Sequence, residues 1–160
     1  MDSSPLTLSD HLCAISWRAR PGSFVSLMTL YESNYIRLGW LLPDVRAIEG
    51  RHVSLAADDL ALHLEVTERC RYTTTLNLSY VLACDAGPVV TPDLRVRVYH
   101  DARLAEACDG APLPRHEQLR RLHASLRQEL NERWARNVLL NKWLEYCAER
   151  GHRFPAPRIP

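Results

Sequence analysis

Apolar and polar residues alternate along the middle of the chain, from Leu60 to Asp101. In three successive runs, leucine, valine or tyrosine occupies every second position, and the positions between carry mostly hydroxyls, amides and charges. A period of two is typical of strands that bury one face. The pattern therefore predicts an antiparallel meander with one covered apolar face and one open polar face.

The first two runs predict a hairpin with a defined register. Pairing Glu68 with Tyr72 leaves a three-residue loop and places Leu64 opposite Leu76. The leucines of both strands then share one face of the sheet, and polar side chains share the other. We therefore expect Leu64 to be buried.

Shorter segments extend the meander on both sides. Residues Gly50 to Ala57 predict a first strand with Val53 and Leu55 pointing inward, and residues 103–108 predict a last strand after a kink. The stretch 83–93 contains a glycine and two prolines, so we expect a surface loop there.

Three- and four-residue spacing of apolar side chains predicts helices at both ends. The first follows Ser23, whose hydroxyl can cap it, and ends before Pro43. From His116 onward the period is again helical, and either one long helix bends near Asn131 or two helices meet there. Gly151 is a suitable helix stop, and we expect the proline-rich tail beyond it to be loosely held.

The elements together predict an α+β fold. Its four- or five-stranded antiparallel meander sheet carries the N-terminal helix and the C-terminal helices on one face. We expect one domain over residues 23–151, an N-terminal extension over 1–22 and a tail over 152–160.

Composition narrows the classes of function. The chain has 160 residues, 46% of them hydrophobic and 24% charged, which is ordinary for a globular protein. Its net charge of +1 provides no general attraction for nucleic acid or an acidic membrane. No apolar run approaches the roughly 20 residues that a membrane helix needs. We expect a cytoplasmic protein that binds neither nucleic acid nor membrane.

The five cysteines are odd in number, and no two of them have C-x-x-C spacing. This favours a reducing compartment and argues against a disulfide framework. The histidines and cysteines show no metal-site spacing, so the sequence predicts neither a metal site nor a cofactor.

The meander brings the first hairpin tip to the end of the third run, which predicts a cluster of polar side chains. Alternation places Glu68 and His100 on the covered face, where ionisable groups are costly unless paired. The cluster is either a pocket for proton transfer or anion binding, or a structural network of ion pairs. Its candidate members are Glu68, Arg71, Tyr72, Tyr99, His100, Asp101 and Glu32.

Four stretches carry a resemblance to a known family. They are the helix Leu30–Tyr35 leading to Pro43, the tip Glu68–Thr74, the strand end Val96–Ala102 and the terminal Trp143–Cys147. In this order they resemble the YqiB-like family of small uncharacterised bacterial proteins, a domain of unknown function. The resemblance implies a whole-domain fold and a bacterial cytosolic setting, and it brings no activity.

Two classes of function follow. A non-catalytic binding or adaptor domain is favoured, because no motif assembles a nucleophile, a base and oxyanion donors. The alternative is a small hydrolase, or a protein that binds a nucleotide or phosphometabolite, using the polar cluster. The partner is then an unknown protein or small molecule, and the sequence does not specify an oligomeric state.

Overall fold

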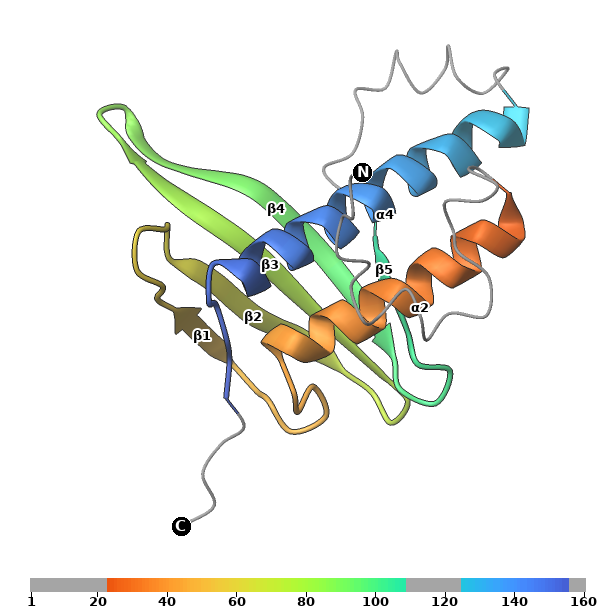
Figure 1. The fold of residues 1–160 in the computed structure, drawn as a ribbon, viewed down its shortest axis with the longest axis horizontal. Helices are drawn as coiled ribbons and strands as arrows, with labels where there is room; N and C mark the ends of the chain where they lie inside the picture. Colours follow the sequence, from red (N-terminus) through yellow and green to blue (C-terminus); the bar gives the residue numbers. More distant parts are fainter. Residues whose placement is uncertain (1–22, 109–124, 156–160) are drawn as a thin grey trace, which may run out of the picture.

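The computed structural model describes residues 23–108 and 125–155 and shows two layers, a sheet and a pair of helices (Figure 1). The sheet has five antiparallel strands in sequence order, each paired with the next. The strands are β1 (Arg51–Ser54), β2 (Leu62–Arg69), β3 (Thr73–Cys84), β4 (Gly87–Tyr99) and β5 (Leu104–Ala107). The predicted α+β fold with an antiparallel meander is confirmed.

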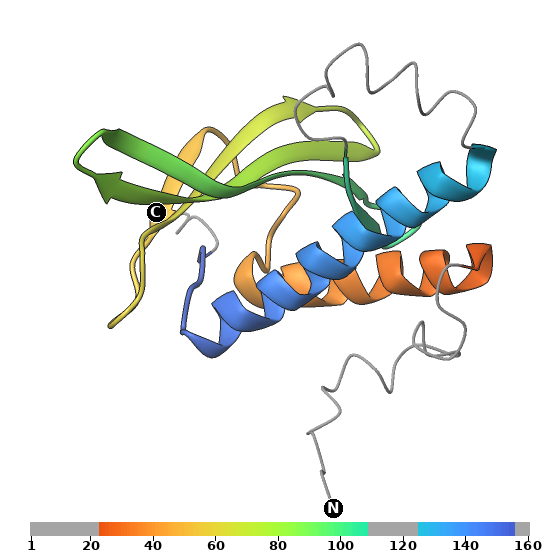
Figure 2. The same cartoon turned by 90° about the horizontal axis from the view of Figure 1, so that it is seen from above.

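Both helices, α2 (Phe24–Leu41) and α4 (Ser125–Glu149), lie side by side on one face of the curled sheet (Figure 2). As predicted, the Ser23 hydroxyl caps α2, accepting the Ser26 N–H at 3.1 Å. The helix α4 continues through Asn131 without a break. The predicted helical segment before Ser125 lies outside the described residues.

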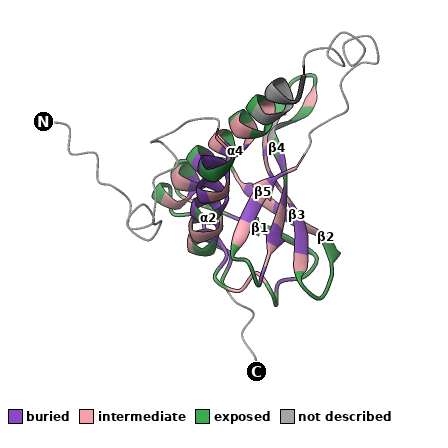
Figure 3. Cartoon of the chain, turned by 90° about the vertical axis from the view of Figure 1, so that its right-hand side faces the viewer, coloured by how far each residue is buried: buried purple, intermediate pink, exposed green. Residues whose placement is uncertain are grey.

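The core fills the space between the two layers, where Figure 3 shows the buried residues gathered. Leucines and valines of β2, β3 and β4 pack against leucines of α2 and against Leu140, Trp143 and Leu144 of α4. Burial of this apolar surface is the main force that holds helices on sheet.

The faces of the first hairpin were predicted correctly, but the pairing partners were not. Leu64 is buried and pairs with Leu78, two residues beyond the predicted partner Leu76. The turn is tighter than expected, because the Cys70 N–H donates to the Thr73 carbonyl at 2.8 Å. A shift of two residues keeps every side chain on its face.

A bulge in β2 changes the end of this hairpin. The register shifts between Val66, which pairs with Leu76, and Glu68, which pairs with Thr75. Thr67 is therefore the extra residue, and such an insertion interrupts the alternation of faces. Glu68, which we expected on the covered face, is exposed.

Residues 83–93 are not a loop, as the sequence had suggested. They belong to long arms of β3 and β4, in which Ala83 pairs with Pro88 and Cys84 pairs with Gly87. This ribbon extends past the end of β2, so Pro88 needs no hydrogen bond on the outer side of β4. The glycine, with a φ of 114°, fits the tight turn.

The edge strand β1 faces opposite to our prediction. Val53 and Leu55 are 53% and 80% exposed, whereas Ser54 is buried. The first residues of the tail after Gly151 are not loose, contrary to our prediction, and residues 156–160 lie outside the described part of the chain. Phe154 is buried and its N–H donates to the Leu41 carbonyl, so the chain is fastened to the end of α2.

Candidate functional site

The two segments of the predicted cluster do meet. The His100 N–H donates to the Tyr72 carbonyl at 2.9 Å, and the buried His100 ring places Nε2 2.9 Å from Thr74 Oγ1. Burial lowers the pKa of His100, and the cations of Arg46 and Arg69 lower it further. The ring is therefore a neutral imidazole at pH 7.

The charged members of the cluster do not converge on one point. The Arg71 guanidinium lies over the Tyr72 ring, 5.1 Å from its centroid, and both side chains are exposed. Asp101 forms an exposed ion pair with Arg46 at 3.3 Å. Both glutamates of the cluster, Glu68 and Glu32, are exposed.

Tyr99 belongs to a separate group around Glu106 of β5. The Tyr99 hydroxyl donates to Glu106 Oε1 at 2.7 Å, and the charge of this carboxylate also acts on Tyr31 of α2. Burial raises the pKa of Tyr31 to about 12, with the Glu106 charge adding to the effect. The same two causes raise the pKa of Tyr99. Both tyrosines therefore stay protonated, and the Tyr99 hydroxyl donates to Glu106.

Beside this group lies a hollow of about 300 Å³ that we call the arginine hollow. Its charged and thiol side chains are Arg95, Arg97, Glu106, Cys108, Arg133 and Arg136. Among the described residues that line it, four guanidinium groups thus share the hollow with one carboxylate. The hydrogen bond with Tyr99 is the main cause that raises the pKa of Arg97, ahead of its attraction to Cys108.

Strand pairing positions the sheet side of the hollow. Arg97 is directly opposite Glu106, and the Cys108 N–H donates to the Arg95 carbonyl at 2.7 Å. Arg95 and Arg97 are two residues apart on β4, so both point to the polar face. The β4–β5 edge therefore presents two cations, one acid and one thiol together.

Asn137 positions the helix side of the hollow. Its Oδ1 accepts the Ala107 N–H at 2.8 Å, which fastens α4 directly to β5. Its Nδ2 donates to the Arg133 carbonyl at 2.8 Å. Arg133 and Arg136 lie within one turn of this anchor and are held beside the end of β5.

A buried polar seam continues from Asn137 between the two helices. Asn34 Nδ2 donates to Asn137 Oδ1 at 3.2 Å, and Asn141 Nδ2 donates to Asn34 Oδ1 at 3.0 Å. At its far end, fully buried Arg37 contacts Glu145 with 2.8 Å between Nη1 and Oε2. Polar groups are tolerated inside a protein when they bond to one another, as most of these do, although Asn141 Oδ1 has no hydrogen-bond partner among the described residues.

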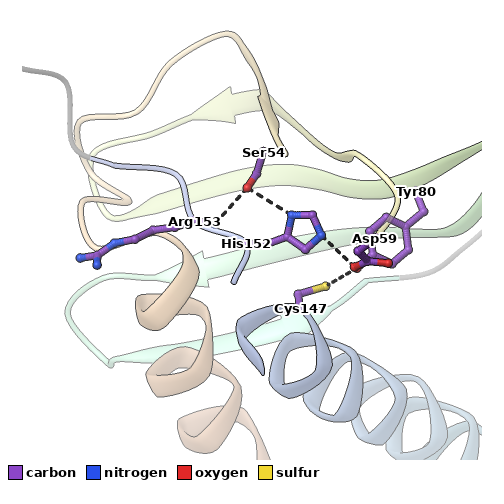
Figure 4. A network of polar contacts seen from close by, with 6 residues as sticks. All are labelled: Ser54, Asp59, Tyr80, Cys147, His152 and Arg153. Carbon is purple, nitrogen blue, oxygen red and sulfur yellow. Dashed lines mark hydrogen bonds and ion pairs between the residues drawn. The ribbon is translucent and has the colours of Figure 1, made fainter. Parts of the chain in front are cut away.

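Figure 4 shows a second polar network, which we call the C-terminal clasp. Its members are Ser54, Asp59, Tyr80, Cys147, His152 and Arg153. His152 lies 2.9 Å from Asp59 Oδ2 through Nε2 and 3.2 Å from Ser54 Oγ through Nδ1. The Tyr80 hydroxyl donates to the same carboxylate at 2.9 Å and lies 3.2 Å from Cys147 Sγ. These contacts fasten the segment after α4 to the sheet.

The clasp has the residue types of a serine hydrolase but not their arrangement. In a catalytic triad Nε2 faces the serine and Nδ1 faces the carboxylate, and here the two nitrogens are exchanged. Ser54 is 5% exposed, and its Oγ already accepts the Arg153 N–H at 2.9 Å. The clasp is therefore suited to holding the chain in place.

Sequence reasoning missed most of the arginine hollow. Arg95 and Arg97 were assigned only to the polar sheet face, while Arg133, Arg136 and Glu106 were not singled out. The available signal was two arginine pairs, at strand spacing in one element and helix spacing in another. Nothing in the sequence places these two elements together.

Within residues 23–108 and 125–155, no group of three or more His, Cys, Asp or Glu side chains is placed to hold a metal ion. Neither helix of this part is long and apolar enough to cross a membrane.

Fold and hollow together define a small α+β protein with a basic hollow at one edge of a five-stranded meander. The chain belongs to the family described as protein of unknown function (DUF1249), whose sequence model matches residues 37–153. The matched range includes every residue of the arginine hollow.

The uncharacterized protein YqiB of Escherichia coli is a relative. The proteins from strain K12 and strain O157:H7 are each 30% identical to this chain over 132 residues, which are 80% of this chain and 90% of the relative. No solved structure matches the chain. The resemblance that the sequence motifs carry is thus confirmed at the level of the family.

Proposed function

We propose that this protein is a non-catalytic binding domain whose arginine hollow takes the anionic group of a small-molecule partner. One observation supports the proposal: among the described residues that line a hollow of about 300 Å³, there are four arginines and one carboxylate. Arginine forks bind carboxylates and phosphates through paired, charge-assisted hydrogen bonds. A concentration of cations that the overall charge of +1 does not predict favours an anion as ligand.

The chemistry of the hollow favours binding over catalysis. Glu106 is the carboxylate among its described lining residues, and its Oε1 already accepts the Tyr99 hydroxyl. A general base must instead be within reach of the proton that it removes from a substrate. The arginines can hold and orient an anion, which is what a binding domain requires.

Isothermal titration of the full chain with pyrophosphate and with citrate, at low ionic strength, tests the proposal. We expect one-to-one binding of at least one of them, weakening as salt is added. Arg95→Gln and Arg136→Gln should each weaken binding by about tenfold, since each removes one charge-assisted contact. Arg71→Gln, an exposed arginine at the hairpin tip, is the matched control and should leave binding unchanged.

Two results would contradict the proposal. One is the absence of binding to both anions; the other is binding that neither hollow variant weakens. If Arg71→Gln weakens binding instead, the anion site lies at the cluster of Arg71, Tyr72 and His100 that the sequence predicted.

A further inference from the structure

We propose that the open face of the sheet carries a second site, which binds the primary ammonium group of a small alkylamine. The site is a hollow of about 450 Å³, lined from β1 to β4 by side chains that include His63, Ser79 and Asp93, which we call the sheet hollow. This volume is within the usual range for ligand pockets. The sheet hollow and the arginine hollow share no described lining residue, so the two sites are independent.

A row of three polar side chains crosses the sheet hollow from strand to strand. His63 of β2 pairs with Ser79 of β3, and Ser79 pairs with Asp93 of β4. A buried leucine adjoins each of them along its strand, so the row points away from the two helices that cover the other face (Figure 2). Side chains paired across strands have Cβ atoms about 4.5–5.5 Å apart, so one small ligand group can reach all three.

The row offers hydrogen-bond acceptors that are not used within the protein. In the described part of the chain, the side chains of His63, Ser79 and Asp93 have no hydrogen-bond or ion-pair partner. A carboxylate, a hydroxyl and a neutral imidazole each provide an acceptor. His63 and Ser79 are half-buried in the hollow, where water or a ligand must complete their hydrogen bonding.

A primary ammonium group matches this row in number and in charge. It has three N–H donors and no acceptor, so each donor can meet one member of the row. In the neighbouring row, the Arg51 guanidinium and the Glu65 carboxylate pair at 2.9 Å. Of the described arginine and acidic side chains that line the hollow, Asp93 is thus the one without an opposite charge. Charge complementarity therefore favours a cation as ligand.

Apolar side chains border the row at both ends. Val53 of β1 pairs with His63, and Val81 pairs with Val90 where the ribbon of β3 and β4 begins; all three valines line the hollow. Val53 and Val90 are 53% and 48% exposed, so an alkyl chain can cover apolar surface there. None of the described lining residues is Phe, Tyr or Trp, and a quaternary ammonium needs a cage of such rings. The hollow therefore suits a primary alkylamine.

Titration of the ¹⁵N-labelled full chain with n-hexylamine, followed by NMR at pH 7.5, tests the proposal. An alkylammonium is charged at this pH, because the pKa of a lysine-type amine is about 10.4. The matched probes 1-hexanol and hexanoate carry the same chain length with no charge and with the opposite charge. Hexylamine should bind at least tenfold tighter than either, with amide shifts concentrated around His63, Ser79 and Asp93. Ethylamine should bind several-fold more weakly than hexylamine, since it covers less apolar surface.

Variants test the role of the carboxylate. Asp93→Asn should weaken hexylamine binding by about tenfold, because it removes one charge-assisted contact. Asp85→Asn is the matched control, since Asp85 is an exposed acid at the turn between β3 and β4, and it should leave binding unchanged. Arg95→Gln removes a cation whose Cα is about 7 Å from that of Asp93, so it should not weaken hexylamine binding. A melting curve of each variant checks the fold, and the three six-carbon probes test the unaltered protein independently.

Several outcomes would overturn the proposal. It is wrong if 1-hexanol binds as tightly as hexylamine, if the shifts lie outside the sheet hollow, or if no alkylamine binds. Equal weakening by Asp93→Asn and Asp85→Asn would show an unspecific attraction of cations. If Nα-acetyl-lysine amide binds and hexylamine does not, the hollow takes a lysine of a partner protein, and the small-molecule ligand is refuted.

The same variants separate this site from the proposed function. Asp93→Asn should leave the binding of pyrophosphate or citrate unchanged, whereas Arg95→Gln should weaken it. Loss of anion binding with intact hexylamine binding, or the reverse, therefore shows which of the two proposals fails.

Discussion

Replacing Glu145 with leucine should destabilise the protein more than replacing its partner Arg37 with methionine. Arg37 is fully buried, whereas 22% of the Glu145 side chain is exposed. Without Arg37, the carboxylate can turn toward water and regain hydration. Without Glu145, the guanidinium stays inside the seam and has lost its carboxylate partner, which is the costlier state.

The expected magnitudes follow from this asymmetry. Removing one partner of a buried ion pair costs about 3–5 kcal/mol, so we expect about 4 kcal/mol for Glu145→Leu. Arg37→Met should cost about 2 kcal/mol, because methionine fills much of the vacated volume and Glu145 rehydrates. The double variant should lie within about 1 kcal/mol of the unaltered protein, since an apolar pair can replace a buried ion pair at little cost.

Urea denaturation followed by tryptophan fluorescence measures these free energies of unfolding. Lys142→Met is the control, because Lys142 is 54% exposed and its Nζ lies 3.8 Å from the same Glu145 oxygen. Exposed pairs contribute little, so this change should stay below about 1 kcal/mol. The reasoning is refuted if Arg37→Met costs as much as Glu145→Leu, or if the double variant costs as much as the sum of the two.

Three further results are expected. Leu64→Ala should lower the free energy of unfolding by about 2–5 kcal/mol in urea denaturation, because Leu64 is only 1% exposed. Leu55 is 80% exposed, so Leu55→Ala should lower it by under about 0.5 kcal/mol. Burial raises the pKa of Asp59, but hydrogen bonds from the Leu60 backbone, His152 and Tyr80 outweigh it and hold the pKa below its ordinary value of 3.8. The Asp59 carboxylate therefore stabilises the fold above pH 3.8, and this contribution is lost as the pH falls through the lower pKa that Asp59 has in the folded protein. Below pH 4, the urea midpoint should thus fall less steeply with pH in Asp59→Asn than in the unaltered protein. Burial raises the pKa of the Cys147 thiol to about 11, so a thiol reagent should label Cys147 only after unfolding, while exposed Cys70 reacts in the native protein.

The sequence predicted the elements of this fold and their faces better than their partners. Alternation identifies which side of a strand is buried, and Leu64 is buried as expected. The partner of Leu64 depends on the turn and on the Thr67 bulge, and neither has a periodic signal. For β1, Ser54 faces inward because it bonds His152, a residue almost one hundred positions away. No local pattern can contain that information.

The candidate cluster was predicted in part for the same reason. Antiparallel order was sufficient to bring Tyr72 beside His100. It was not sufficient to direct the charged side chains, since the bulge exposes Glu68, and Asp101 pairs with Arg46 from outside the meander. The arginine hollow needs the position of α4 relative to β5, which tertiary packing alone determines.

The polar seam explains how that position is determined. An interface made only of leucines tolerates sliding of one helix along another, because dispersion and burial have no direction. The amides of Asn34, Asn137 and Asn141 bond to one another and to the Ala107 N–H in one register, and another register would break these hydrogen bonds. In that register, Arg133 and Arg136 lie beside β5 and share the hollow with the arginines of β4. The seam inside the helix pair thus sets the geometry of the proposed anion site outside it.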